Sequence, residues 1–182
     1  YFCRAQKSDF EYKPIDNLAK TKYDVNHILK EVDQIDGYYD LEDALPKQQN
    51  SKEMIDYTDH LQRAIDKYKF VRFPNFPITI NKEGLKIPSN SVLIFQEKSK
   101  ILITENDAEW YEIFDIENVE NVTIIHAKIE GDRFKHLGTK GEWGMGIAIR
   151  GSRNVRIINP VITNCWGDGI YIGSSKNVHS EN

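Results

Sequence analysis

The sequence has little of what several functional classes require. Only two of its 182 residues are cysteine, Cys3 and Cys165, which leaves no disulfide framework; we expect Cys165 to pack at a turn and Cys3 to be free. The five histidines show no metal-ligand spacing. No apolar run approaches the roughly 18 residues of a membrane-spanning helix. A net charge of −4 without a basic stripe argues against nucleic acid as a partner.

What the sequence does contain is a phrase that returns along its second half. Residues 114–129 read FDIENVENVTIIHAKI, residues 147–162 read IAIRGSRNVRIINPVI, and residues 170–178 read IYIGSSKNV. The last two copies are offset by 23 residues and the first two by 33, with the extra residues in 131–146. Aligned, the copies form columns of like residues: Phe114, Ile147 and Ile170; Ile116, Ile149 and Ile172; Asn121, Asn154 and Asn177; Val122, Val155 and Val178.

Short alternating strands that repeat with such a period predict a solenoid, here an all-β parallel β-helix. One coil cannot bury its inward isoleucines alone. Coils stacked at the usual strand spacing of roughly 4.8 Å place like residues on one another, and the asparagines can then form a ladder of amide hydrogen bonds. A β-sandwich with coincidental spacing is the alternative fold.

Two zones precede the repeat. Residues 1–50 are predicted to form a helical or extended arm, with one helix marked by Val25, Ile28, Leu29, Val32 and Ile35 and a linker after Gly37. Residues 51–182 begin with a short helix, whose buried face is Leu61, Ala64, Ile65 and Tyr68, and continue into the first coils. Because Asn182 falls in the middle of a repeat, we expect the coils to continue beyond it, or a partner or second copy to cover the open end. The start at Tyr1 is typical of a processed or excised piece.

Residues 56–95, DYTDHLQRAIDKYKFVRFPNFPITINKEGLKIPSNSVLIF, resemble the opening segment of the pectate-lyase-like superfamily. The family pattern Asp-x-Thr-x-x-Leu-Gln-x-Ala-Ile-Asp is matched by Thr58, Leu61, Gln62, Ala64, Ile65 and Asp66, and Phe73-Pro74 follows as expected. The family's usual Pro-x-Gly is replaced by Asn75-Phe76-Pro77. The resemblance covers about residues 53–182 and implies a right-handed β-helix whose first coil is covered by a capping helix. It also implies a polysaccharide lyase or glycoside hydrolase that acts outside the cytoplasm, secreted or periplasmic.

The segment Asn164-Cys-Trp166-Gly-Asp168-Gly resembles the polygalacturonase phrase Asn-Thr-Asp-Gly. This resemblance puts Asp168 on the first of that family's catalytic aspartates, as an acid, a base or a calcium ligand. Alternatively, Asp168 is a turn residue that bonds its own backbone. The matching positions one and two coils earlier are Met145 and Glu112, so no repeated carboxylate pair is predicted below Asp168. A cluster of Asp168 with Glu112 or Asp115 would favour an enzyme.

Two further groups are candidates for the outward face. Elimination from a uronate needs a base, and Tyr171 or the insertion residues Arg133, Lys135 and His136 could face a polyanion; alternatively, the insertion is a solvated loop. Aromatic side chains can stack on sugar rings, or else pack loops against the body. Those that fall near the turns before one series of strands are Trp110, Trp143, Trp166 and Tyr171.

We therefore predict an extracellular protein that cleaves an acidic polysaccharide in a groove along the β-helix. The catalytic candidates are Asp168, Tyr171 and His136. The substrate-binding candidates are Trp110, Trp143, Trp166, Arg133, Lys135, Glu112 and Asp115. Calcium is the one cofactor that the sequence suggests. The alternative is a non-catalytic module that binds glycan or supports assembly, like a tailspike or an adhesin, alone or as a homo-oligomer.

Overall fold

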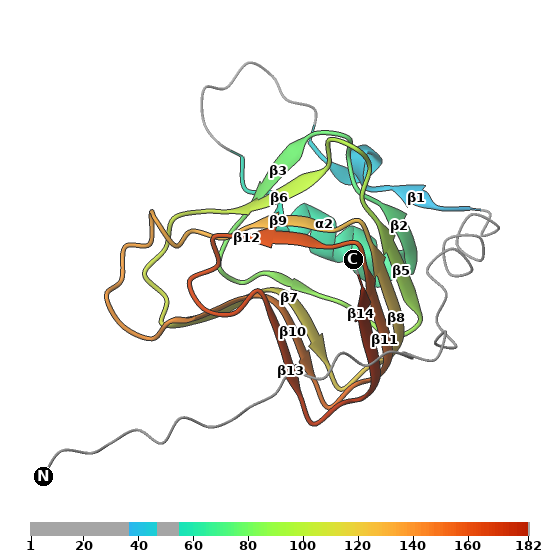
Figure 1. Ribbon diagram of the computed structural model, residues 1–182. Helices are drawn as coiled ribbons and strands as arrows, with labels where there is room; N and C mark the ends of the chain where they lie inside the picture. The colour runs from blue at the N-terminus through green and yellow to red at the C-terminus, as the bar shows by residue number, and fades with distance from the viewer. Residues whose placement is uncertain (1–36, 47–54, 182) are drawn as a thin grey trace, which may run out of the picture.

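The computed structural model describes residues 37–46 and 55–181, which build three parallel sheets stacked as successive coils (Figure 1). Sheet A contains β1 (Tyr39–Asp40), β2 (Phe70–Arg72), β5 (Ser91–Ile94), β8 (Glu120–Ile125), β11 (Arg153–Ile158) and β14 (Lys176–Glu181). Sheet B contains β3 (Pro77–Ile80), β6 (Lys100–Ile103), β9 (Lys128–Glu130) and β12 (Val161–Thr163). Sheet C contains β4 (Leu85–Lys86), β7 (Trp110–Glu117), β10 (Trp143–Arg150) and β13 (Ile170–Gly173). The predicted parallel β-helix is confirmed.

The strand register follows the columns of the sequence repeat. In sheet C, Ile147 pairs with Phe114 on one side and with Ile170 on the other. In sheet A, Val155 pairs with both Val122 and Val178. Each column member is therefore one coil away from the next, and the extra residues of the 33-residue repeat lie in the loop between β9 and β10. The repeat thus fixes both the strands and their register.

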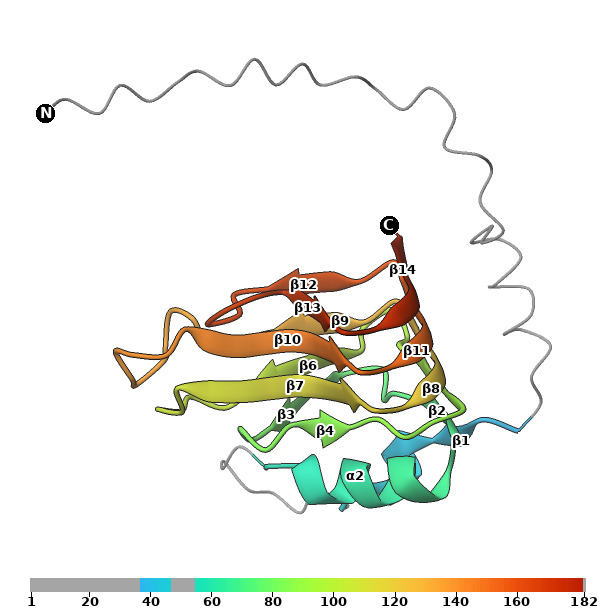
Figure 2. The same ribbon diagram turned by 90° about the horizontal axis from the view of Figure 1, so that it is seen from below.

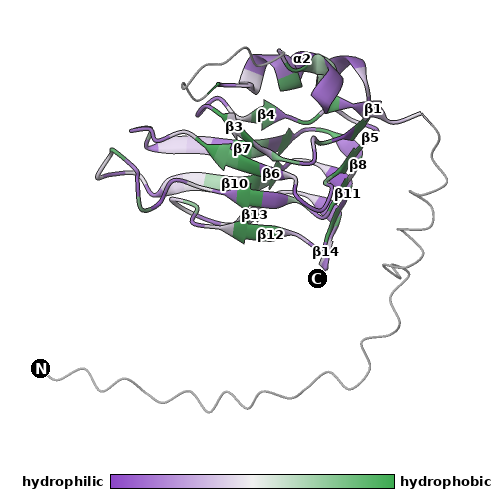
Figure 3. Cartoon of the chain, turned by 90° about the horizontal axis from the view of Figure 1, so that it is seen from above, coloured by the Kyte–Doolittle hydropathy of each residue, from purple (hydrophilic) through white to green (hydrophobic). Residues whose placement is uncertain are grey.

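The core fills the interior between the three sheets. Ile116, Ile124 and Ile129 are buried, and so are Ile149 and Ile157 in the next coil, because strands turn the side chains of one face inward. Ile162, the next-coil equivalent of Ile129, is partly buried against them. Lower in the stack, Phe73 lies on Phe95 with ring centroids 4.3 Å apart, and both contact Phe114. In Figure 3 most of the hydrophobic colour lies on the strands, whereas α2 is hydrophilic on the side away from the sheets.

Helix α2 (Thr58–Lys67) covers the first coil, as the resemblance implied (Figure 2). Its N-terminus is stabilised by Asp56, whose Oδ1 accepts hydrogen bonds from the backbone N–H and the hydroxyl of Thr58. Leu61, Ala64 and Ile65 face the core. The Gln62 amide donates to the carbonyl of Lys86 and accepts from its N–H, so a side chain satisfies the open edge of β4.

The predicted asparagine ladder is present and one step longer than expected. Each Nδ2 donates to the Oδ1 one coil below, from Asn177 to Asn154 (3.1 Å), to Asn121 (3.0 Å) and to Asn90 (2.9 Å). All four residues have a φ between 53° and 60°. Asparagine tolerates this left-handed conformation better than other side-chain-bearing residues, which explains its repeated use at this corner.

The start of the described chain packs against the body, where the sequence indicated a linker or extended arm. β1 pairs with β2, and Leu41 of the 3-10 helix η1 (Leu41–Ala44) is fully buried. Tyr39 stacks on Tyr68 with ring centroids 3.8 Å apart. The predicted helix over residues 25–35 and Cys3 lie outside the described residues. Within the described ranges, no helix is long and apolar enough to cross a membrane.

Candidate functional site on the outer face of sheet C

β7 and β10 are the long strands of sheet C, and their outward residues lie side by side. Trp110 pairs with Trp143, and Glu112 with Met145. Ile113 and Phe114 are both fully buried, which interrupts the strict alternation along β7. As a consequence, Glu112 and Asp115 both stand on the outer face, three positions apart. Here β7 and β10 bring an aromatic pair and two carboxyl groups onto one surface.

The two tryptophans form an exposed aromatic plate. Their ring centroids are 6.1 Å apart and the ring planes differ by 16°. Trp110 is 55% exposed and Trp143 54% exposed. The Nε1–H of Trp110 donates a hydrogen bond to Oε1 of Glu112 at 2.5 Å, which orients the indole. A flat apolar surface of two rings therefore lies open to solvent at one end of the sheet, and its position is set by cross-strand pairing rather than by a loop.

Arg150 connects the plate to the other polar groups. Its Nη1 lies 2.7 Å from Oε1 of Glu112. Its guanidinium carbon lies 5.0 Å from the ring centroid of Trp110 and 5.1 Å from that of Tyr171. Arginine over an aromatic face is a favourable cation–π arrangement. One side chain thus holds an aromatic ring from β7, a carboxylate from β7 and an aromatic ring from β13 in fixed positions.

Asp115 has an unusual environment on this face. Burial raises the pKa of its carboxyl group, and the nearby carboxylates of Glu112 and Glu117 raise it further, against the opposing effects of Arg150 and Lys86. Its Oδ1 is buried and has no hydrogen-bond partner among the described residues. The Asp115 carboxyl group therefore holds its proton to a higher pH than an ordinary aspartate does, next to a Glu112 that is ion-paired with Arg150. Two carboxyl groups with different environments are what general acid–base chemistry requires.

Asp168 lies at the edge of this face. It is exposed in the loop before β13, and its carbonyl accepts a hydrogen bond from the N–H of Gly146 at 3.0 Å. The register continues the column of Met145 and Glu112, as the repeat offset predicted. Within the described chain, no hydrogen bond or ion pair joins the Asp168 carboxylate to Glu112 or Asp115. The carboxyl groups that the structure brings together are Glu112 and Asp115.

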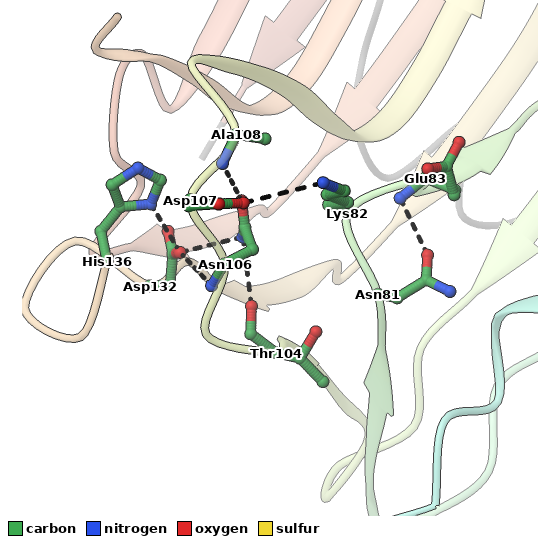
Figure 4. A network of polar contacts seen from close by, with 9 residues as sticks. All are labelled: Asn81, Lys82, Glu83, Thr104, Asn106, Asp107, Ala108, Asp132 and His136. Carbon is green, nitrogen blue, oxygen red and sulfur yellow. Dashed lines mark hydrogen bonds and ion pairs between the residues drawn. The ribbon is translucent and has the colours of Figure 1, made fainter. Parts of the chain in front are cut away.

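The prediction that His136 faces a polyanion is wrong. Its ring is fully buried, and Nδ1 lies 2.8 Å from Oδ2 of Asp132 (Figure 4). Asp132 also accepts hydrogen bonds from the Tyr111 hydroxyl (2.5 Å) and the Asn106 amide (2.9 Å). Burial, and then the hydrogen bond to Asp132, raises the pKa of Tyr111. The Asp132 carboxylate, at the start of the insertion, contacts the His136 ring in the interior of the protein, and this places His136 away from any substrate surface.

Trp166 belongs to the same buried network. Its ring stacks on His136 with centroids 4.2 Å apart, and its Nε1 is buried without a partner among the described residues. It packs against the core, so it is not part of the exposed plate. Gly144 makes room for the network from β10, because a Cβ there would lie 2.3 Å from Cζ of Tyr111.

Arg133 and Lys135 are exposed, but they do not lie over sheet C. Arg133 lines a hollow with Thr163, Asn164 and Gly167, and Lys135 lines a groove along sheet B. The Lys135 ammonium is 3.9 Å from Glu105. The insertion therefore does not extend the aromatic plate with cations. The predicted strip of residues is divided by the fold into a sheet C face and a separate loop.

Comparison with known proteins agrees with this architecture. Residues 79–182 match the family model described as "Right handed beta helix region". The chain belongs to this family. The chain is similar, over 98 residues and at 39% identity, to the SPbeta prophage-derived uncharacterized protein YorA of Bacillus subtilis. It is also similar, over 95 residues and at 30% identity, to the uncharacterized protein YclG of the same organism.

The matched regions are parts of larger proteins. They cover 50% and 49% of this chain but only 17% and 16% of the two relatives. The chain thus corresponds to about one sixth of the length of the curated relatives it matches. No solved structure matches it. The comparisons establish the right-handed β-helix family. What the chain binds or acts on is inferred from the residues on the outer surface of the coils.

Two residues that organise this right-handed β-helix were not predicted in the roles that they have. Arg150 ends β10 on the outward side, and its partners became visible only once the coils were stacked. Asp132 begins the insertion and anchors it. For calcium, the described ranges contain no group of three or more His, Cys, Asp or Glu side chains that could hold a metal ion.

Proposed function

We propose that the outer face of sheet C binds a polysaccharide. The supporting observation is the pair Trp110 and Trp143, stacked in register with more than half of each side chain exposed. Sugar rings present apolar C–H faces that stack on aromatic rings. Exposed aromatic surface of this extent, edged by polar groups, is typical of a ligand-binding face. Tyr171 extends the aromatic surface toward the next coil, with Arg150 between the rings.

The charges on this face favour a neutral or weakly charged glycan over the acidic one expected from the sequence. The outward carboxyl groups are Glu112, Asp115 and Glu117, and Asp168 lies beside them. The opposing cations are Arg150, which is already paired with Glu112, and Lys86. A polyuronate would meet repulsion from most of the titratable groups it passed. Polysaccharide binding is in keeping with a location outside the cytoplasm, secreted or periplasmic.

A second candidate function is hydrolysis of the bound glycan. The observation that favours it is the pairing of a carboxyl group with a raised pKa, Asp115, with the ion-paired Glu112 on the same face. In this proposal Asp115 protonates the glycosidic oxygen, and Glu112 acts as the second carboxylate that glycoside hydrolases use. Elimination is less favoured, because His136 is buried and Arg150 is occupied by its ring and carboxylate partners.

Binding and hydrolysis are tested together with a panel of neutral and acidic polysaccharides. Full-length wild type is compared with a Trp110→Ala, Trp143→Ala double variant in affinity electrophoresis, and Phe76→Ala serves as the control for loss of an exposed aromatic side chain. The proposal predicts retardation by at least one glycan for wild type and control, and none for the double variant. Equal retardation of all three proteins would overturn it.

Release of reducing ends separates the two candidate functions. Hydrolysis predicts that Asp115→Asn keeps the binding of wild type but loses cleavage, since an amide cannot donate a proton to the leaving oxygen. If wild type binds a glycan and releases no reducing ends from any member of the panel, the hydrolytic candidate is rejected and binding alone remains.

A further inference from the structure

The loop between β9 and β10, residues 131–142, projects beyond the ends of the sheets (Figures 1 and 2). This loop carries Phe134, which is 82% exposed, and Leu137, which is 67% exposed, and we refer to these two side chains together as the apolar tip. Within residues 37–46 and 55–181 these are the two most exposed large hydrophobic side chains. Single exposed apolar residues are ordinary on protein surfaces, but two within one short projecting loop are typical of a surface that contacts a partner.

The exposure of this tip is built into the fold. The N–H groups of Arg133 and Leu137 donate to carbonyls of Asn164 (2.9 Å) and Asn106 (2.9 Å). Inside the loop, the side chains of Asp132 and His136 are buried and in contact with each other, and Asn106 donates a hydrogen bond to Asp132 (Figure 4). The Tyr111 hydroxyl donates a further hydrogen bond to Asp132. The buried residues on both sides of the turn force Phe134 outward. The loop therefore presents its apolar side chains in a fixed geometry.

The apolar tip has a cationic rim. Arg133, Lys135 and Lys140 are exposed in the loop, while of its two acidic residues Asp132 is buried and Glu142 is exposed. The acidic groups of the neighbouring loop are partly neutralised, because Glu105 lies 3.9 Å from Lys135 and Asp107 lies 3.8 Å from Lys82. On a chain of net charge −4, this small excess of positive charge coincides with its most exposed apolar side chains.

We propose that the β9–β10 loop is a contact site for an anionic lipid surface. Phe134 and Leu137 enter the boundary between headgroups and acyl chains, where apolar side chains leave water. Arg133, Lys135 and Lys140 remain at headgroup level, where long basic side chains can bury their stems and keep their charges in water. A sugar polyanion would use the cations and could stack on Phe134, but it offers no apolar phase for the aliphatic side chain of Leu137, and for this reason lipid is the favoured partner. This inference is independent of polysaccharide binding on sheet C.

The test is co-sedimentation of the full chain with vesicles of phosphatidylcholine alone and of phosphatidylcholine containing 30% phosphatidylglycerol. Wild type is expected to sediment with the anionic vesicles. Phe134→Ser with Leu137→Ser should weaken this binding by at least about tenfold. Arg133→Gln with Lys140→Gln should weaken it by about fivefold for each charge removed. The matched control is Val161→Ser, which removes an exposed apolar side chain from sheet B.

Each outcome decides the proposal. Loss of binding in both loop variants, with unchanged thermal unfolding and a normal Val161→Ser control, supports it. Absence of wild-type binding to the anionic vesicles overturns it, and so does binding that all variants share. If soluble dextran sulfate binds through the cations, and the serine variant binds vesicles as wild type does, the loop recognises polyanions rather than lipid, and the proposal is likewise overturned.

Discussion

Replacement of Asp132 by alanine tests whether the buried network holds the insertion in place. The carboxylate is the shared acceptor for the Tyr111 hydroxyl at 2.5 Å, the Asn106 amide at 2.9 Å and His136 Nδ1 at 2.8 Å. A hydrogen bond to a charged group contributes about 1.5–3 kcal/mol to the free energy of unfolding. Because removal of one partner leaves the others buried and unpaired, we expect Asp132→Ala to cost about 3–5 kcal/mol in total.

Urea denaturation followed by tryptophan fluorescence measures this cost. With a slope of about 2 kcal/mol per molar urea, the midpoint should fall by about 1.5–2.5 M. Tyr111→Phe removes one donor from the same acceptor and should cost about 1.5–3 kcal/mol. If Asp132→Ala does not fold, this milder variant carries the test. A midpoint shift below about 0.3 M for either variant would refute the view that the network stabilises the fold.

Three other predictions follow from single positions. Asn121→Ala should lower the free energy of unfolding, measured by urea denaturation, by about 1–2 kcal/mol more than Asn121→Gly does, because φ at this ladder position is 58° and alanine is strained there. Equal losses of unfolding free energy in the two variants would contradict this. Because the pKa of Tyr111 is raised in the folded state, the unfolded tyrosine ionises above about pH 10 while the folded one stays protonated. The free energy of unfolding of wild type should therefore fall with pH in this range, by about 1.4 kcal/mol per pH unit more than that of Tyr111→Phe. Asp115→Asn should raise the urea midpoint at pH 7, since the folded state disfavours the charged carboxylate. This gain should vanish as the pH falls below the ordinary aspartate pKa of about 3.9, where Asp115 is protonated in both the folded and the unfolded state.

The fold could be predicted in detail because its determinants are periodic. The columns that begin at Phe114, Ile116 and Asn121 predicted the strands, their register and the ladder. They could do so because residues one repeat apart in the sequence become neighbours in adjacent coils of a parallel stack. Asn90 was missed because residues around it do not share the remainder of the phrase. The short helix was predicted from the spacing of its buried residues, and its capping role followed from the resemblance to a family. The hydrogen bonds of Gln62 to the edge of β4 give the physical reason for that role.

The candidate site was predictable only in part. Trp110, Trp143, Glu112 and Asp115 were among the predicted residues, and stacking placed them together on sheet C. The outward position predicted for His136 was wrong, because the residues of the insertion have no periodic spacing from which their direction can be predicted. Nothing in Arg-Phe-Lys-His indicates that Asp132 is buried and draws His136 inward. Arg150 was missed for another reason, since its partners lie on β7 and β13, in the coils on either side of its own, and no local sequence pattern records them.

The proposed binding of glycan to the outer face of sheet C is tested most directly by hydroxyl-radical footprinting of the full chain, with and without a polysaccharide that it retains. We expect the glycan to protect Trp110, Trp143 and Tyr171, whereas Phe70 and Phe76, which lie away from sheet C, should react as before. Protection of Phe70 without protection of the two tryptophans, or no protection under saturating glycan, would contradict it.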